Sequence, residues 1–147
     1  MLRFVAELAA FERLSDELEV DGAEARLREH LFGREPRCEV LLADDAGNAV
    51  GFALFYPTYS TFKTAPCLHL EDLYVTPAAR GSGIGEALLR EVARIARDRG
   101  CARLQWNVLD WNRRAIAFYE RMGASLLGDW RTCRVEGAAA LRALADS

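Results

Sequence analysis

The sequence predicts a mixed α/β fold of the α+β kind, in a single domain over residues 1–147. Three observations predict it. Two helix-like segments open the chain, β-like runs joined by short turns follow, and the remainder alternates between strand-like and helix-like stretches. Short turns join antiparallel strands, whereas a helix between two strands is typical of a parallel crossover. At this length we expect one hydrophobic core rather than two.

The first part of the chain is expected to form two helices and a hairpin. Residues 1–14, MLRFVAELAAFERL, carry apolar side chains at helical spacing. Residues 21–33, DGAEARLREHLFG, predict a second helix, with Asp21 and Glu24 as a capping pair. Residues 38–44 and 49–60 are β-like, and the DAGN sequence between them suits a tight turn.

The remaining elements follow a strand and helix alternation. Residues 67–75, CLHLEDLYV, predict a third strand, and an amphipathic helix follows up to Gly100. The apolar stripe of that helix consists of Ile84, Leu88, Val92 and Ile95. Residues 102–109 predict a strand, residues 112–123 a helix, and residues 130–136 a last strand before an Ala-rich tail.

Composition and charge exclude several classes of protein. The net charge of −3 argues against a general nucleic-acid binder, and no apolar run approaches the roughly 18 residues that a membrane span needs. The cysteines are far apart and form no ligand pair with histidine, which predicts reduced structural thiols and no metal site. They are Cys38, Cys67, Cys101 and Cys133. The start of the chain shows no signal-peptide pattern, so we expect a cytoplasmic protein.

The stretch RGSGIG, residues 80–85, joins the third predicted strand to the amphipathic helix. Such a junction presents backbone N–H groups at the positive end of the helix dipole, which attracts phosphate. Glycines let the backbone approach an anion closely, because no Cβ intervenes. The spacing fits neither a P-loop nor the GxGxxG dinucleotide pattern. The turn is therefore either an anion-binding loop of another kind or a plain structural connection.

Two longer stretches decide between these alternatives. LHLEDLYVTPAARGSGIG and, after one helix and one strand, VLDWNRRAIAFYERMGA resemble the two conserved blocks of the GNAT superfamily of acetyl-CoA-dependent N-acyltransferases. The likeness spans nearly the whole chain and is strongest to the diamine group, which comprises the spermidine/spermine and thialysine acetyltransferases. The resemblance implies a GNAT fold, acetyl-CoA as co-substrate, no metal, a small amine as acceptor, and a homodimer.

The resemblance also implies which residues bind acetyl-CoA. The main chain of Leu73, Tyr74 and Val75 would pair with pantetheine, although core packing alone explains Leu73 and Val75. The pyrophosphate would be bound by Arg80, Gly81, Ser82, Gly83, Ile84 and Gly85. Asn112 would contact CoA with Arg113, Arg114 and Ala115 nearby, and it is also a favoured helix N-cap.

Two catalytic residues are implied. Tyr119 lies two helical turns beyond Asn112 and would protonate the departing thiolate as a general acid, unless it is a core residue. Glu71 would bind the cationic amine and help to deprotonate it, because a reference pKa near 10.4 leaves only about one amine in a thousand neutral. The alternative for Glu71 is an ion pair, for example with an arginine. His69 would share its face and serve as an alternative base or as a structural residue.

The acceptor end of the site is expected near the first helix. Phe11 and Glu12 resemble the family's aromatic and acidic pair at the substrate mouth, while strand alternation places Asp72 on the face opposite to Glu71. Phe62 replaces a tryptophan common in the family's substrate loop. Lys63 beside it would oppose a polycation, which favours a smaller amine or an amino-acid-like acceptor.

We therefore expect an N-acetyltransferase in which a primary amine attacks the thioester directly in a ternary complex, with two alternatives. One is a protein or peptide N-acetyltransferase, and the other is a non-catalytic CoA-binding regulatory module, which the presence of both Glu71 and Tyr119 disfavours. Family members usually have a strand before the first helix, and this sequence begins at the helix. An uncovered sheet edge at that place would favour association.

Overall fold

The computed structural model describes residues 1–146 and divides the chain into two compact units, Met1–Asn107 and Val108–Ser147. The first unit holds the sheet. Its elements are α1 (Leu2–Glu12), η1 (Ser15–Glu17), α2 (Ala23–Phe32), β1 (Glu39–Asp45), β2 (Asn48–Ser60), β3 (Ala65–Val75), η2 (Pro77–Ala79), α3 (Ile84–Asp98) and β4 (Leu104–Gln105). That both units together form one domain over residues 1–147 stays a prediction.

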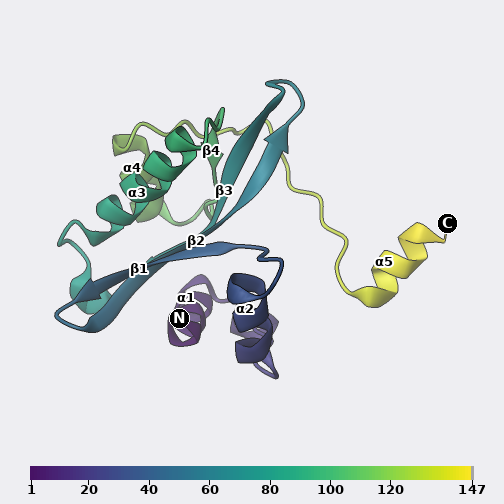
Figure 1. Cartoon of the computed structure of the whole chain (residues 1–147), viewed down its shortest axis with the longest axis horizontal. Helices are drawn as coiled ribbons and strands as arrows, with labels where there is room; N and C mark the ends of the chain where they lie inside the picture. The colour runs from purple at the N-terminus through teal and green to yellow at the C-terminus, as the bar shows by residue number, and fades with distance from the viewer. Residues whose placement is uncertain (147) are drawn as a thin grey trace. The chain divides into compact units, whose positions relative to one another are not determined.

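The sheet has the strand order β1-β2-β3-β4. The β1–β2 and β2–β3 pairs are antiparallel, and β4 pairs with β3 in parallel after the α3 crossover. In Figure 1, α1 and α2 lie on one side of the sheet and α3 on the other. The structure confirms the mixed α/β fold, and in the described residues no strand precedes α1.

The hairpin turn between β1 and β2 forms where the sequence predicts it. Ala46 and Gly47 both adopt positive φ angles, of 52° and 86°, which a tight two-residue turn requires. The Asp44 carboxylate accepts a hydrogen bond from the Gly47 N–H at 2.8 Å. This short connection fixes the register in which Asp45 pairs with Asn48.

Aromatic packing attaches α1 to the sheet. Phe4 of α1, Phe52 of β2 and Tyr74 of β3 are buried together, with ring centroids 5.8–6.4 Å apart. Burying a side chain of this size contributes about 2–3 kcal/mol, so this cluster is a main stabilising contact of that face. On the other face α3 buries a stripe formed by Leu88, Leu89, Val92 and Ala96.

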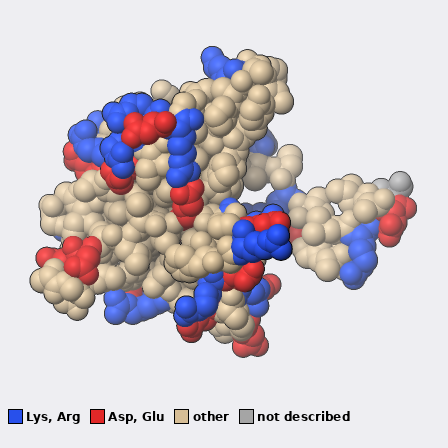
Figure 2. All heavy atoms as spheres, viewed as in Figure 1, with Lys and Arg blue, Asp and Glu red and all other residues tan. Residues whose placement is uncertain are grey.

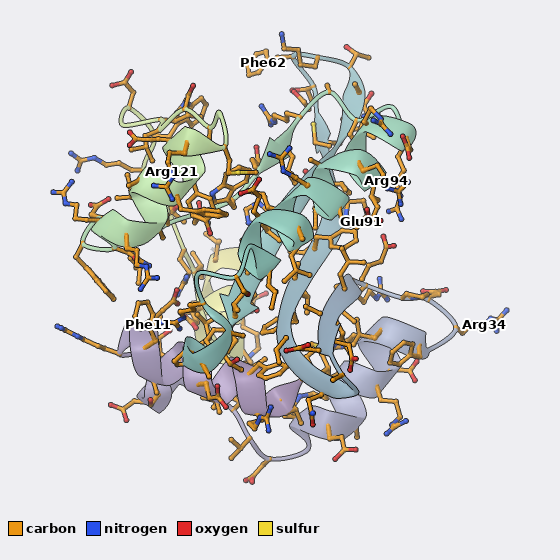
Figure 3. The ribbon with its side chains drawn as sticks, turned by 90° about the vertical axis from the view of Figure 1, so that its left-hand side faces the viewer. Phe11, Arg34, Phe62, Glu91, Arg94 and Arg121 are labelled. Carbon is orange, nitrogen blue, oxygen red and sulfur yellow. The ribbon has the colours of Figure 1, made fainter. Side chains whose placement is uncertain are left out.

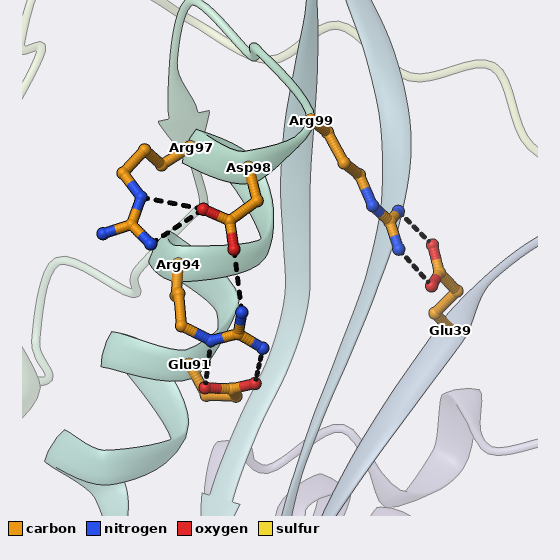
Figure 4. Close-up of polar contacts among 6 residues, drawn as sticks. All are labelled: Glu39, Glu91, Arg94, Arg97, Asp98 and Arg99. Atoms are coloured by element: carbon orange, nitrogen blue, oxygen red, sulfur yellow. Dashed lines mark hydrogen bonds and ion pairs between the residues drawn. The ribbon is translucent and has the colours of Figure 1, made fainter.

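The outer face of α3 carries paired charges. Arg94 contacts both Glu91 and Asp98, and Arg97 also contacts Asp98 (Figure 4). Figure 2 shows positive and negative side chains side by side on the face in view rather than one broad area of a single sign. Exposed pairs of this kind contribute little stability. They leave the arginines of this face largely neutralised.

The end of α3 is tied to the start of β1 by a bidentate pair. Arg99 donates to both carboxylate oxygens of Glu39, at 2.6 and 2.7 Å (Figure 4). These hydrogen bonds lower the pKa of Glu39. In residues 1–146, no helix is both long and apolar enough to span a membrane.

The second unit contains α4 (Arg113–Arg121) and α5 (Ala138–Ala145). Asn112 caps α4, because its side-chain oxygen accepts the Ala115 N–H at 3.2 Å. The predicted strand over residues 130–136 is wrong, because these residues belong to no strand of the described sheet. The Ala-rich tail forms α5 instead, since alanine and leucine strongly favour helix.

Two predicted details of the first unit also need correction. The Asp21 and Glu24 capping pair is wrong, because Gly22 in a left-handed conformation is the N-cap of α2 and no side chain caps that end. The predicted strand over residues 102–109 is shorter than expected, since only Leu104–Gln105 pairs with β3.

Candidate active site

A β-bulge in β3 positions Glu71. The pairing between β2 and β3 runs from Leu54 with Asp72 directly to Phe55 with Leu70, so Glu71 has no partner residue across the ladder. A bulge of this kind bends the strand locally and redirects a side chain, and bulges are frequent beside active sites.

The bulge changes which side chains share a face. Leu54 and Tyr56 lie on the same face of β2, two residues apart, and their partners on β3 are Asp72 and His69. Asp72 and His69 therefore lie on one face. The prediction that alternation places them on opposite faces is wrong, because alternation with a period of two holds only in a strand without a bulge.

Glu71 is contacted by a phenol and an imidazole. The Tyr56 hydroxyl donates a hydrogen bond to Glu71 Oε2 at 3.0 Å, and His69 Nε2 lies 3.7 Å from the same oxygen. The rings of Tyr56 and His69 stack with their centroids 5.2 Å apart. The Glu71 side chain is 52% exposed. In residues 1–146 no arginine pairs with Glu71, and the basic group beside it is the imidazole of His69.

Three carboxyl groups gather near this point. Burial is the main cause that raises the pKa of Asp72 to about 6, and the negative charges of Glu71 and Glu12 raise it further. Burial also raises the pKa of Glu12, at the end of α1. The charges of Glu71 and Glu12 disfavour the ionised form of Asp72, so a cation placed among the three groups would relieve that repulsion. The arrangement is chemically suited to a small molecule with ammonium groups.

The turn over residues 80–85 has the backbone of an anion-binding loop. Gly81 and Gly83 have φ angles of 86° and 88°, and a Cβ added to either would meet nothing within 4 Å. Gly83 is the N-cap of α3, which has no side-chain cap, so its first N–H groups are available to a ligand. The residues present therefore fit a pyrophosphate at the start of α3.

The Arg80 side chain contacts the ends of β3 and α1. Its Nε donates to the Val75 carbonyl at 3.0 Å, and its guanidinium lies over the rings of Phe11 and Tyr74, at 5.4 and 5.7 Å from their centroids. Tyr74 in turn donates its hydroxyl to Glu7 at 2.6 Å. Arg80 thus links the end of α1 with the end of β3.

The other predicted residues of the first unit are placed as follows. Leu73 and Val75 are half-buried near the end of β3, and Ser82 donates to the Ala79 carbonyl at 2.6 Å. Figure 3 shows Phe11 at the end of α1 and Phe62 at the tip of the β2–β3 hairpin, far apart in the first unit. Phe62 is 94% exposed.

The remaining predicted residues lie in the second unit. Asn112 caps α4, Arg113 and Arg114 are exposed in its first turn, and Ala115 supplies the capped N–H. Tyr119 is half-buried two turns further along, with its ring 5.2 Å from that of Phe118. Because Tyr119 and Glu71 belong to different units, their joint action stays a prediction.

Sequence reasoning did not single out Tyr56. The signal that could have found it is the hairpin register, which pairs Tyr56 with His69 and brings its hydroxyl to Glu71. That register depends on the bulge, at which the adjacent polar residues Glu71 and Asp72 interrupt the alternation of the sequence.

Comparison with known proteins gives a consistent result. The Acetyltransferase (GNAT) family matches residues 5–124. The chain is 40% identical to a thialysine N-epsilon-acetyltransferase of Bos taurus, over 95% of this chain and 86% of that one. It is 37% identical to a human spermidine/spermine N(1)-acetyltransferase-like protein 1, over 84% of this chain and 18% of that protein.

A solved structure agrees. The integron cassette protein VCH_CASS6 from the mobile metagenome of V. cholerae superposes with a TM-score of 0.79 at 31% identity, covering 96% of this chain and 86% of that one. The enzymes of the matched family use acetyl-CoA as co-substrate. The sequence, the fold and the relatives agree, and the chain belongs to the GNAT acetyltransferase family and is an N-acetyltransferase.

Proposed function

We propose that this enzyme transfers the acetyl group of acetyl-CoA to a primary amine of a small cationic molecule by direct attack in a ternary complex. The acceptor class comprises diamines, polyamines and amino acids similar to lysine or thialysine. One observation carries the proposal: Glu71 and Asp72, two of the three clustered carboxyls, and the anion-binding turn follow one another on β3 and its continuation. A group that attracts cations and a loop that suits phosphate are thereby placed along one segment of the chain.

The cofactor end is assigned to backbone groups. The N–H groups of Gly81, Ser82, Gly83, Ile84 and Gly85, with Arg80, bind the pyrophosphate at the positive end of α3. The main chain of Leu73, Tyr74 and Val75 aligns the pantetheine arm, and Asn112, Arg113, Arg114 and Ala115 contact it from the start of α4. When bound, the co-substrate supplies an acetyl group activated as a thioester.

The acceptor end is assigned to side chains. Glu71 binds the ammonium and removes its proton, directly or through a water molecule, because an amine with a pKa near 10.4 must lose a proton before it can attack. Glu12, Asp72 and Phe11 hold the rest of the acceptor. Tyr119 donates its phenolic proton to the departing sulfur. Holding both partners in line contributes most of the rate.

The bovine relative is named for thialysine, which is an amino acid, and this supports an amino-acid-like or short diamine acceptor over spermidine. Lys63 was expected to oppose a polycation, but it follows Phe62 at the tip of the β2–β3 hairpin, far from Phe11 (Figure 3), so the expected repulsion has no structural support. A free N-terminus or lysine of a protein or peptide is the alternative acceptor, and a basic peptide included among the substrates distinguishes it.

We further propose that the two units form one GNAT domain that assembles as a homodimer. The family match over residues 5–124 crosses the boundary between the units, which supports one domain. Trp130 and Leu127 are 76% and 71% exposed, and the β-like stretch over residues 130–136 lies outside the described sheet. A second copy could cover these residues, and sedimentation measures the state directly.

The experiment that tests the assignment is two-substrate kinetics with a matched pair of variants. Glu71→Gln should lower kcat/KM for the amine by about a hundredfold or more and leave the KM of acetyl-CoA unchanged. Glu24→Gln, on exposed α2, removes the same charge and serves as the control. Intersecting double-reciprocal lines support the ternary complex. Parallel lines, or full activity in Glu71→Gln, would contradict the proposal.

A further inference from the structure

The hydrogen bond between Tyr56 and Glu71 divides the work of the two carboxylate oxygens. Oε2 accepts the Tyr56 hydroxyl at 3.0 Å and has His69 Nε2 at 3.7 Å. In residues 1–146 no hydrogen bond involves Oε1. One oxygen is therefore held by the protein, and the other makes no hydrogen bond to it.

The position of Glu71 explains why such a contact is needed. A bulged residue has no cross-strand partner, so the ladder does not fix its direction. A half-exposed glutamate side chain has several rotatable bonds, and it loses considerable rotamer freedom whenever it adopts one geometry. A hydrogen bond from the neighbouring strand restricts that freedom before the acceptor arrives.

Tyr56 is well suited to this task. Its ring stacks on His69 at 5.2 Å, which holds the phenol in place above the bulge. Burial, followed by the hydrogen bond and the charge of Glu71, raises the pKa of Tyr56 to about 12. The phenol therefore stays protonated, and remains a donor, at every pH at which the enzyme would work.

We propose that Tyr56 is a positioning residue for the transfer reaction: by holding Oε2 it directs Glu71 Oε1 toward the ammonium of the acceptor. This inference rests on the proposed function, because it assigns a partner to the carboxylate that receives the amine. Tyr56 itself touches neither the acceptor nor the acetyl donor. Its effect on the rate passes through Glu71 alone.

A double-mutant cycle tests this dependence. The values of kcat/KM for thialysine are measured at saturating acetyl-CoA in the wild type, Tyr56→Phe, Glu71→Ala and the double variant. Tyr56→Phe should lower kcat/KM about tenfold in the wild type, as expected for a hydrogen bond to a charged group. In the Glu71→Ala background the same substitution should change kcat/KM by no more than about twofold. Calorimetry should give equal acetyl-CoA affinities throughout.

Tyr59→Phe is the matched control. Tyr59 lies on the same strand, is 59% exposed, and belongs to no part of the assigned site. Its substitution removes the same hydroxyl and should leave kcat/KM within about twofold of the wild type.

The outcomes separate the inference from the function on which it rests. A tenfold loss on Tyr56→Phe in both backgrounds would mean a general structural role and would overturn the inference, as would no loss in the wild-type background. If Glu71→Ala itself retained full kcat/KM, the proposed base would be wrong and the inference would fall with it. If Tyr56→Phe lowers kcat/KM only in the background that contains Glu71, the result supports both the inference and the proposed role of Glu71.

Discussion

Replacing Asp72 by asparagine is predicted to stabilise the folded protein at neutral and alkaline pH. Burial, with the charges of Glu71 and Glu12, raises the Asp72 pKa from its ordinary 3.8 to about 6. Because the folded-state pKa is the higher one, the native state binds the proton more tightly than the unfolded state. The stabilising contribution is therefore present below about pH 4 and is lost as the pH rises through about 6.

The difference between the two pKa values corresponds to about 3 kcal/mol of lost stability at about pH 8. Asp72→Asn cannot ionise and avoids that loss. Urea unfolding should therefore show the variant more stable than the wild type by about 3 kcal/mol at about pH 8 and by about half as much at about pH 5. Comparing variant with wild type at each pH removes the effects of the other titrating groups.

Asp16→Asn provides the matched control, since Asp16 lies exposed in η1 and is not among the charges that raise the pKa of Asp72. It should leave the free energy of unfolding near the wild-type value at both pH values. A stability difference for Asp72→Asn that is the same at both pH values would refute the electrostatic reasoning. So would a variant that is less stable than the wild type at the higher pH.

Substitutions at three further positions probe the other assigned groups. Tyr119→Phe should lower turnover at least about tenfold with little change in acetyl-CoA affinity, and unchanged turnover would make Tyr119 a core residue. Arg80→Met loses the bond to Val75 and two ring contacts, so urea unfolding should show a loss of about 2 kcal/mol; an unchanged midpoint would show that these contacts contribute nothing. Asn112→Ala removes the helix cap and should lower the free energy of unfolding, measured by thermal unfolding, by about 1 kcal/mol. Asn112→Asp can still cap the helix and should retain most of that stability.

The parts of the fold that depend on local sequence were predictable. The turn between β1 and β2 follows from a short polar sequence that contains Gly47, and the start of α4 follows from the capping side chain of Asn112. The amphipathic stripe of α3 needs only the helical period. In each case the determining residues are close neighbours in the chain.

The parts that depend on distant pairing were not predictable. The bulge at Glu71 exists only relative to Leu54 and Phe55 on the neighbouring strand. The adjacent polar residues Glu71 and Asp72 interrupt the alternation of the sequence, but only the pairing with β2 shows that a bulge forms there. For this reason the face of Asp72 was predicted wrongly and Tyr56 was not singled out. The stretch over residues 130–136 contains residue types that favour strands, but a strand forms only where another one pairs with it.

The central claim is that this N-acetyltransferase uses acetyl-CoA to acetylate a small cationic amine. Free-thiol release from acetyl-CoA tests it most directly, measured with spermidine, putrescine, lysine, thialysine and a basic peptide in turn. The account predicts release that depends on a small amine, with thialysine or a short diamine favoured over spermidine and the peptide. Release stimulated by the basic peptide alone, or by none of the acceptors, would contradict it.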